Sequence, residues 1–219
     1  MQLQLNNNRK LATLNLVPGQ QVYGEKLINL EGREYRVWDP FRSKLAAAIK
    51  KGMKQIPIKE GSKVLYLGVS TGTTASHVSD LIGERGVLFA VEFAQRVARE
   101  FIDRVASRRP NVIPIIEDAR RVEEYHVIYD KVDVVYCDIA QPDQTEIAIG
   151  NCAHYLKAGG FLLLVVKARS IDVLEDPKKT FDQETSKLRS SGFRIVATLR
   201  LEPYDKDHLM ILAENISNL

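Results

Sequence analysis

The chain has 219 residues, of which 45% are hydrophobic, and its formal net charge is +3. This length suits one large domain or one domain with a small appendage, and so weak a positive charge does not by itself indicate nucleic-acid binding. No apolar run approaches the roughly 18 residues that a membrane-spanning helix needs. The first residues also lack the basic and apolar blocks of a signal peptide. We therefore expect a soluble, cytoplasmic protein whose two cysteines are reduced core residues.

Residues 1–55 have a short, strand-like pattern followed by good helix formers. Turn signals at Pro18-Gly19 and Glu31-Gly32 separate the apolar stretches. The region is predicted to form a small antiparallel β-sheet and one helix. The predicted strands are Lys10–Val17, Gln21–Leu30 and Glu34–Trp38, and the predicted helix is Phe41–Met53.

Residues 56–219 alternate strands and helices and are predicted to form the main domain. Strands rich in Val, Ile and Leu are typical of a mostly parallel sheet with helices on both faces. We expect Lys157 to Gly160 to be a helix-ending turn. The predicted strands are Val64–Gly68, Val87–Glu92, Val112–Ile116, Val132–Cys137, Phe161–Val166, Phe193–Leu199 and Leu209–Ala213. The predicted helices are Thr74–Ile82, Gln95–Arg108, Asp143–Leu156 and Lys179–Ser190.

The last two predicted strands are too close together for a helix to lie between them, so they should pair antiparallel. Seven strands with an antiparallel final strand are the pattern of the class I S-adenosylmethionine (SAM)-dependent methyltransferases. The predicted fold class is therefore α/β, a Rossmann-like sheet of this type preceded by the small N-terminal antiparallel sheet.

The turn after the first strand of the main domain carries Gly68, Ser70 and Gly72, and Thr73 and Thr74 then open a helix. A strand, a glycine-containing turn and a helix N-terminus form the usual binding place for nucleotide-like ligands in an open α/β sheet. A dinucleotide fingerprint would have glycines where this chain has Ser70 and Thr73. The turn therefore favours SAM over NAD.

Three acidic residues each follow a different predicted strand, namely Glu92, Asp118 and Asp138. Because the carboxyl ends of parallel strands meet at one edge of the sheet, these carboxylates should line one crevice. Glu92 could accept both hydroxyls of a ribose, in NAD as well as in SAM. Phe93 could lie against an adenine or belong to the core. The alternative for the acids is that they cap surface helices.

The candidate catalytic residues are Lys44, Lys167 and His208. Lys167 directly follows a run of apolar strand residues, so its amine should face the crevice at the edge of the core. The alternatives are an ordinary strand-end lysine that reaches solvent for Lys167, a structural role for His208, and simple solvent exposure for Lys44.

At this point the pattern resembles fibrillarin, and in particular its short archaeal form, because the glycine- and arginine-rich tail of the eukaryotic form is missing. The resemblance covers almost the whole chain. The matching stretches are VPGQQVYGE (residues 17–25), WDPFRSKL (38–45), YLGVSTGTTASHVSD (66–80), VEF (91–93), EDA (117–119), DIAQP (138–142), VKARSID (166–172) and EPYDKDH (202–208).

The resemblance implies SAM-dependent 2′-O-methylation of ribose in pre-rRNA, and in tRNA, during rRNA and tRNA processing. It implies that Glu92 holds the cofactor ribose. It also implies a catalytic set of Lys44, Asp138 and Lys167, with His208 in a fourth place. The cofactor-binding residues implied by the turn and the resemblance are Gly68, Ser70, Gly72, Thr73, Thr74, Glu92, Phe93, Asp118, Ala119, Asp138, Ile139, Ala140 and Gln141, with no metal site.

The resemblance also implies partners. A box C/D guide RNA would choose the target nucleotide, a Nop-domain scaffold protein of the Nop5 type would dock the enzyme, and an L7Ae-type kink-turn-binding protein would complete the particle, in the cytoplasm of an archaeal cell and without a membrane. Two other functions stay open at this point. One is a stand-alone methyltransferase acting on RNA or a small molecule, and the other is a non-catalytic scaffold subunit.

Overall fold

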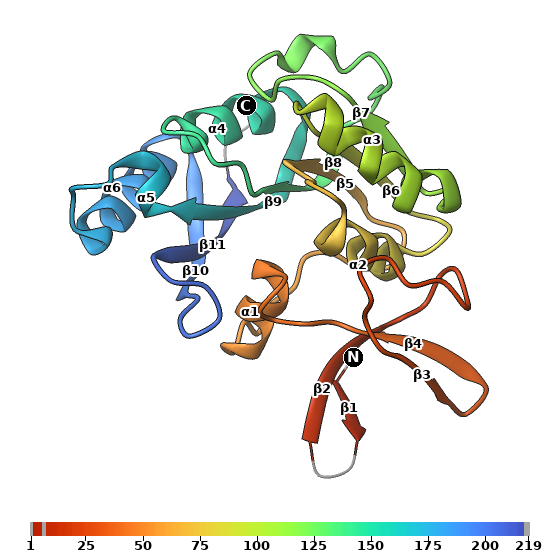
Figure 1. Cartoon of the computed structure of the whole chain (residues 1–219). Coiled ribbons are helices and arrows are strands. Elements are labelled where there is room, and N and C mark those ends of the chain that lie inside the picture. The colour runs from red at the N-terminus through yellow and green to blue at the C-terminus, as the bar shows by residue number, and fades with distance from the viewer. Residues whose placement is uncertain (1, 6–7, 217–219) are drawn as a thin grey trace.

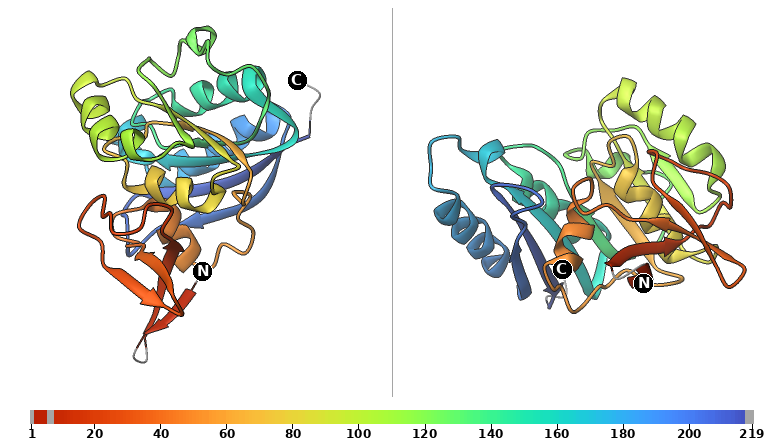
Figure 2. Two further views of the ribbon diagram at one scale, coloured as in Figure 1. Left: turned by 90° about the vertical axis from the view of Figure 1, so that its right-hand side faces the viewer. Right: turned by 60° about the horizontal axis from the view of Figure 1, so that its bottom comes forward.

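The computed structural model describes residues 2–5 and 8–216. It contains one sheet of four strands and one of seven. Figures 1 and 2 show the smaller sheet projecting from one end of the larger α/β part, with helix α1 (Lys44–Lys50) between it and the C-terminal strands. Within the described residues, no helix is long and apolar enough to cross a bilayer.

The larger sheet has the strand order β10-β11-β9-β8-β5-β6-β7. Strands β5 to β9 run parallel, whereas β11 is antiparallel to both of its neighbours. The prediction of seven strands with an antiparallel last strand is therefore confirmed. The strands are β5 (Lys63–Leu67), β6 (Val87–Val91), β7 (Val112–Ile115), β8 (Val132–Cys137), β9 (Leu156–Lys167), β10 (Phe193–Arg200) and β11 (His208–Asn215).

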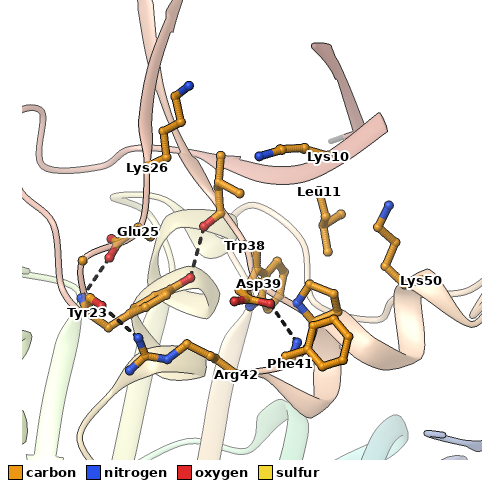
Figure 3. A pocket seen from close by; sticks show the side chains of 13 residues that line it. Lys10, Leu11, Tyr23, Glu25, Lys26, Trp38, Asp39, Phe41, Arg42 and Lys50 are labelled. Carbon is orange, nitrogen blue, oxygen red and sulfur yellow. Dashed lines mark hydrogen bonds between the residues drawn. The ribbon is translucent and has the colours of Figure 1, made fainter. Parts of the chain in front are cut away.

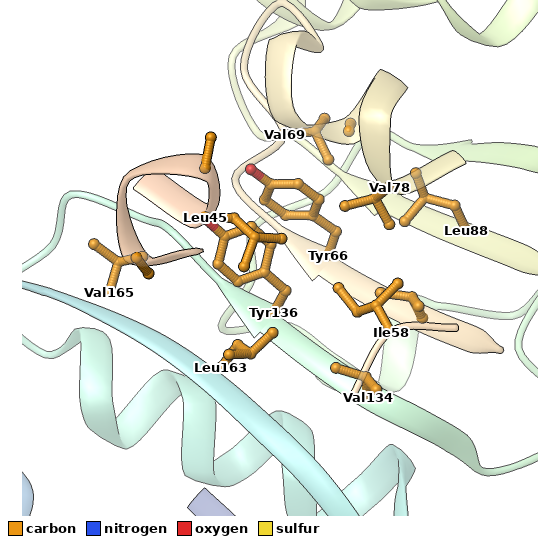
Figure 4. Packing of buried hydrophobic residues seen from close by; sticks show 14 of the residues in the cluster. Leu45, Ile58, Tyr66, Val69, Val78, Leu88, Val134, Tyr136, Leu163 and Val165 are labelled. Atoms are coloured by element: carbon orange, nitrogen blue, oxygen red, sulfur yellow. The ribbon is translucent and has the colours of Figure 1, made fainter. Parts of the chain in front are cut away.

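Helices cover both faces of this sheet because the buried strand residues alternate between two hydrophobic clusters. Tyr66 of β5 and Tyr136 of β8 point toward α1 and α2, as Figure 4 shows, whereas Leu65 and Cys137 join the cluster on the opposite face. Both cysteines are buried and free, as predicted. The remaining helices are α2 (Thr73–Ile82), α3 (Gln95–Arg104), α4 (Gln144–Tyr155), α5 (Ala168–Ile171) and α6 (Pro177–Ser190), with short 3-10 turns at Ala106–Arg108 and Val122–Glu124.

The N-terminal sheet departs most from its prediction. Its strands are β1 (Gln2–Leu5), β2 (Asn8–Leu14), β3 (Leu27–Leu30) and β4 (Arg33–Val37), in the order β1-β2-β4-β3. The predicted strand over residues 21–30 is therefore wrong for all but its last four residues. The segment before β3 is an irregular loop, because the Glu25 carboxylate accepts the backbone N–H groups of Val22 and Tyr23 that a strand would offer to a neighbour.

Other boundaries differ as well, and α3 ends at Arg104 rather than at the predicted Arg108. Helix α1 is shorter than predicted, because Ser43 caps its N-terminus and Gly52 leaves the helical region at φ +97°. The predicted turn at Lys157 to Gly160 is part of β9, which begins directly at Leu156. The pairing jumps there from Val132–Leu156 to Val134–Phe161, so the glycines form a bulge inside the strand rather than a connection before it.

A buried polar network joins the N-terminal sheet to α2 across the boundary predicted near residue 55. The Arg36 guanidinium on β4 lies 2.8 Å from Asp80 Oδ2 and donates through Nε to Glu25 Oε1 at 2.6 Å. Arg109 Nη1 lies 2.6 Å from the other oxygen of Asp80, and Thr13 Oγ1 donates to Oδ2 at 2.7 Å. The two parts also share one hydrophobic core, in which Leu11 and Trp38 belong to the same cluster as the β5 residues.

His77 lies in the middle of this network. Its ring stacks on Trp38 with 4.7 Å between centroids, its Nδ1 lies 2.8 Å from Thr13 Oγ1, and its Nε2 lies 2.7 Å from the Tyr23 hydroxyl. Burial, assisted by the positive charges of Arg36 and Arg109, holds the pKa of His77 well below its usual 6.5. The imidazole is therefore neutral in the folded protein.

This burial gives the stability a pH dependence. Below about pH 6.5 the unfolded chain binds a proton at His77 that the folded chain does not. The free energy of unfolding should therefore fall as the pH drops below that value, by at most about 1.4 kcal/mol per pH unit for this one group, until the folded-state pKa is passed. Urea denaturation at a series of pH values, for the parent protein and for His77→Gln, measures this slope. The slope of the free energy of unfolding against pH should be smaller in the glutamine variant, because the contribution of His77 is gone. Equal slopes in the two proteins would contradict a neutral buried His77.

Candidate active site

All the predicted site residues except Gly72 and His208 line two adjoining cavities at the carboxyl ends of the parallel strands. The first, of about 340 Å³, we call the strand-end cavity, and the second, of about 240 Å³, the lysine cavity. Both are bordered by the same four residues, Gly68, Ser70, Asp138 and Lys167. The predicted residues that line the strand-end cavity besides these four are Glu92, Phe93, Asp118, Ala119, Ile139, Ala140 and Gln141, and those that line only the lysine cavity are Lys44, Thr73 and Thr74.

The turn between β5 and α2 requires glycine at two positions for different reasons. At Gly68, with φ +81°, a Cβ would stand 2.9 Å from Ile139 Cγ2 and 3.1 Å from the Asp138 carbonyl oxygen. This glycine therefore lets the turn and the β8 loop meet at the cavity edge. At Gly72, with φ +95°, a Cβ would stand 2.5 Å from Val105 Cγ2 and 2.8 Å from Phe101 Cδ2. Gly72 thus allows packing against α3 and lies outside the residues that line either cavity.

Glu92 directly follows β6, and its carboxylate is fixed in place. Oε2 accepts the Ser70 backbone N–H at 2.9 Å, and Oε1 accepts the Ala94 N–H at 3.0 Å. Each oxygen keeps a lone pair that can accept a hydroxyl. Phe93, the next residue, is 69% exposed and lines the same cavity. The alternative that Phe93 is a core aromatic is therefore excluded.

Arg120 is a residue of this site that the sequence analysis missed. Its guanidinium donates to Gln141 Oε1 at 3.1 Å and to Asp143 at 2.7 Å, so it joins the loop after β7 to the loop after β8. The Asp118 carboxylate, in turn, accepts the Arg120 backbone N–H at 2.9 Å. The sequence shows only a pair of adjacent arginines here, and nothing in that pair indicates a bridge across a cavity.

The two predicted catalytic lysines converge on one carboxylate. Lys167, at the end of β9, lies with Nζ 2.8 Å from Asp138 Oδ1 and donates to the Asp138 carbonyl oxygen, also at 2.8 Å. Lys44, the first residue of α1, lies with Nζ 3.3 Å from the same Oδ1. The side chains of Lys167 and Asp138 are only 14% and 10% exposed. The alternatives in which Lys44 and Lys167 are ordinary lysines that extend into solvent are therefore excluded.

His208 reaches the cluster through a residue that the sequence analysis did not single out. Its Nδ1 lies 3.0 Å from Asp205 Oδ1, and Lys44 Nζ lies 3.7 Å from Asp205 Oδ2. Burial opposes the ionisation of Asp205, but the hydrogen bond with His208 and the charges of His208, Lys44 and Lys167 outweigh it and keep the pKa of Asp205 below its usual value. The three-residue spacing between Asp205 and His208 is the only sign of this pair in the sequence.

The geometry sets what the site can do. Lys44 and Lys167 both face Asp138, and Lys44 also faces Asp205, so the Lys167 amine is the group that can stabilise an oxyanion in the lysine cavity. The strand-end cavity offers a fixed carboxylate, an exposed aromatic face and polar loop atoms, which suit an adenosine-type ligand. Within residues 2–5 and 8–216, no group of three or more His, Cys, Asp or Glu is placed to hold a metal ion.

Comparison with known proteins gives consistent matches over nearly the whole chain. A family model described as fibrillarin matches residues 1–217. The chain is 54% identical over 204 residues to the fibrillarin-like rRNA/tRNA 2′-O-methyltransferase of Saccharolobus islandicus, covering 93% of this chain and 88% of that protein. The Methanococcus jannaschii fibrillarin, a pre-rRNA processing protein, superimposes with a TM-score of 0.93 at 46% identity, covering 97% of this chain and 92% of that one.

Two further solved structures contain a ligand or a partner. The Aeropyrum pernix fibrillarin in complex with natively bound S-adenosyl-L-methionine has a TM-score of 0.88 at 47% identity, covering 95% of this chain and 90% of that one. A fibrillarin/Nop5p complex has a TM-score of 0.83 at 37% identity, covering 92% of this chain and 93% of that one.

Proposed function

The chain belongs to the fibrillarin family, and on that premise we propose that it transfers the methyl group of SAM to the 2′-hydroxyl of a ribose in rRNA and tRNA. The observation that carries the proposal is the cluster of Lys44, Asp138 and Lys167. It lies where the strand-end cavity meets the lysine cavity, so that a cofactor and a ribose could meet there.

The strand-end cavity suits SAM. Glu92 has free lone pairs for the two ribose hydroxyls, and exposed Phe93 can lie against the adenine with Asp118 and Ala119. The close approach at Gly68 leaves the Asp138 to Gln141 loop beside the amino-acid end.

We assign Thr73 and Thr74, which both line the lysine cavity, to the methionine end of the cofactor. The Thr74 hydroxyl also donates to Ser43 Oγ at 2.9 Å and so ties α2 to α1. When bound, SAM supplies an electrophilic methyl group. Holding a hydroxyl in line with such a group can contribute on the order of 7–11 kcal/mol.

Lys167 and Asp138 are placed to act on the ribose hydroxyl. Asp138 fixes the Lys167 amine through one side-chain oxygen and its carbonyl oxygen. The amine can stabilise the alkoxide that develops as the hydroxyl releases its proton to solvent and its oxygen takes up the methyl group. Lys44 and the pair of Asp205 and His208 lie on the side of α1 and can position the ribose and a neighbouring phosphate.

The choice of target nucleotide would come from partners. A net charge of only +3 gives the isolated chain little long-range attraction for RNA. This supports a box C/D guide RNA that pairs with the target, a Nop5-type scaffold protein and an L7Ae-type kink-turn-binding protein, and the solved fibrillarin/Nop5p complex supports the scaffold. We also propose an archaeal cytoplasmic location. Residues 56–219 are proposed as the SAM-dependent methyltransferase domain, and residues 1–55 as a small sheet and helix that contribute Lys44 to its site.

Stepwise reconstitution tests this function. Calorimetry of the isolated chain should show SAM binding and no NAD binding, and methyl transfer to a target RNA should appear only when guide RNA, scaffold and kink-turn-binding protein are added. Robust site-specific methylation by the chain alone would contradict the need for a guide. An inactive complete assembly would contradict the proposed reaction.

A further inference from the structure

A third cavity, of about 500 Å³, lies between the N-terminal sheet and the start of α1. We call it the N-terminal pocket. Figure 3 shows Lys10, Lys26 and Lys50 around its upper side, with Phe41 and Arg42 below them. The cluster of lysines at the active site does not include any of these residues.

The acidic residues that line this pocket offset only part of the positive charge of Lys10, Lys26 and Arg42. Glu25 also lines it, but its carboxylate binds the buried Arg36 guanidinium at 2.6 Å. Asp39 Oδ1 accepts the Phe41 backbone N–H at 2.9 Å and so shapes the start of the helix. Arg42 donates to the Tyr23 carbonyl oxygen at 3.0 Å and lies 4.9 Å from the centroid of the Tyr23 ring. Its guanidinium is thus oriented by neutral groups and keeps its charge for a ligand.

Arg42 also lines the lysine cavity, so the N-terminal pocket and the catalytic cluster share a wall. Phe41, beside it, is 68% exposed and forms an edge-to-face pair with Tyr204, with ring centroids 5.0 Å apart. Tyr204 belongs to the same loop as Asp205, which contacts Lys44. An RNA strand that leaves the catalytic cluster on this side would pass Phe41 and then reach the basic residues of the N-terminal pocket.

Resting on the proposed function, we infer that the N-terminal pocket binds the target RNA strand beside the methylated nucleotide. Lys10 and Lys26 contact backbone phosphates of the target strand in its duplex with the guide, and Arg42 contacts the phosphate nearest the reacting ribose. RNA is favoured over an acidic protein segment because the target strand must already pass Lys44 in the lysine cavity, whose wall Arg42 shares with the N-terminal pocket. The N-terminal sheet thereby acts as a second, sequence-independent contact to the substrate.

The test measures RNA affinity separately from methyl transfer. The complete assembly, with a guide RNA and a fluorescently labelled target RNA, is prepared with the parent chain and with the double variant Lys10→Gln/Lys26→Gln. Both lysines are exposed, so the variant should fold. Its affinity for the target should be lower on the order of tenfold at moderate salt, and the slope of log affinity against log salt should be smaller by about 1.8, the value for two phosphate contacts on a duplex. SAM affinity by calorimetry should not change.

Matched variants locate the effect. Lys59→Gln/Lys178→Gln removes two equally exposed lysines that do not line the pocket, and it should leave target affinity unchanged. Equal target affinity in the parent and the Lys10→Gln/Lys26→Gln assemblies would overturn the inference. Loss of scaffold binding by that variant, measured by co-elution, would also overturn it in favour of a protein contact. Absence of methyl transfer by the parent assembly would instead count against the proposed function, since RNA affinity is measured without it.

Discussion

Replacing Lys167 by alanine is expected to lower the single-turnover rate of methyl transfer by about 10²–10³-fold at saturating SAM and RNA. This is the usual cost of removing one preorganised group that stabilises a developing oxyanion. The Lys167 amine is held 2.8 Å from both Asp138 Oδ1 and the Asp138 carbonyl oxygen, so its position is fixed before substrate arrives. Transfer of a labelled methyl group to target RNA in the complete assembly measures the rate.

Asp138→Ala should cost a similar factor, because it releases Lys167 and leaves Lys44 without its closest carboxylate. The double variant should lose much less than the product of the two factors, since the residues act as a unit. Lys157→Ala is a matched control, because Lys157 lies near the other end of β9, is exposed, and pairs with its own aspartate, Asp133. Near-parental rates in both Lys167→Ala and Asp138→Ala would reject the catalytic assignment.

Arg36→Met should destabilise the folded protein by about 3–5 kcal/mol, the cost of breaking a buried charge network by removing one partner. The side chains of Arg36 and Asp80 are both 0% exposed, and Arg36 also holds Glu25 and Ser76. Methionine keeps much of the side-chain volume of arginine, but Glu25 loses the guanidinium with which it pairs. Chemical denaturation monitored by circular dichroism gives the free energy of unfolding.

Arg85→Met makes the same chemical change at an exposed ion pair. Arg85 lies 2.6 Å from Glu60, but both side chains are largely in solvent, so its loss should cost no more than about 1 kcal/mol. If the two variants lost equal stability, the buried network would not be holding the N-terminal sheet in place.

Much of the main domain could be predicted because its signals are local. Apolar runs of strand length are separated by helical patterns, and the chain needs no distant partner to show this periodicity. The position of Glu92, Asp118 and Asp138 at one sheet edge then follows from parallel topology alone, and the structure places all three there. Lys167 was predictable for the same reason, since it ends a strand of that sheet.

The remaining features depend on contacts between distant parts of the chain. The loop around Glu25 has the apolar pattern of a strand. It is irregular because the Glu25 carboxylate pairs with Arg36 and with local N–H groups. Gly72 stands in a cofactor-like turn but is required by Phe101 and Val105 of the next helical segment. Asp205 joins the active site only because β11 pairs with β9 and brings His208 opposite Lys167.

The buried network around Asp80 also bears on how the protein folds during its synthesis. Thr13 and Asp80 are separated by 67 residues, and Arg36 and Asp80 by 44, so the N-terminal strands leave the ribosome well before their partners. At the usual rate of about 5–20 residues per second, the wait for Asp80 after Thr13 lasts roughly 3–13 s, and Arg109 follows later. The earliest segment cannot bury its charges until α2 has been made. The nascent N-terminal sheet should therefore remain open and accessible to proteases and chaperones until the first half of the chain has been translated.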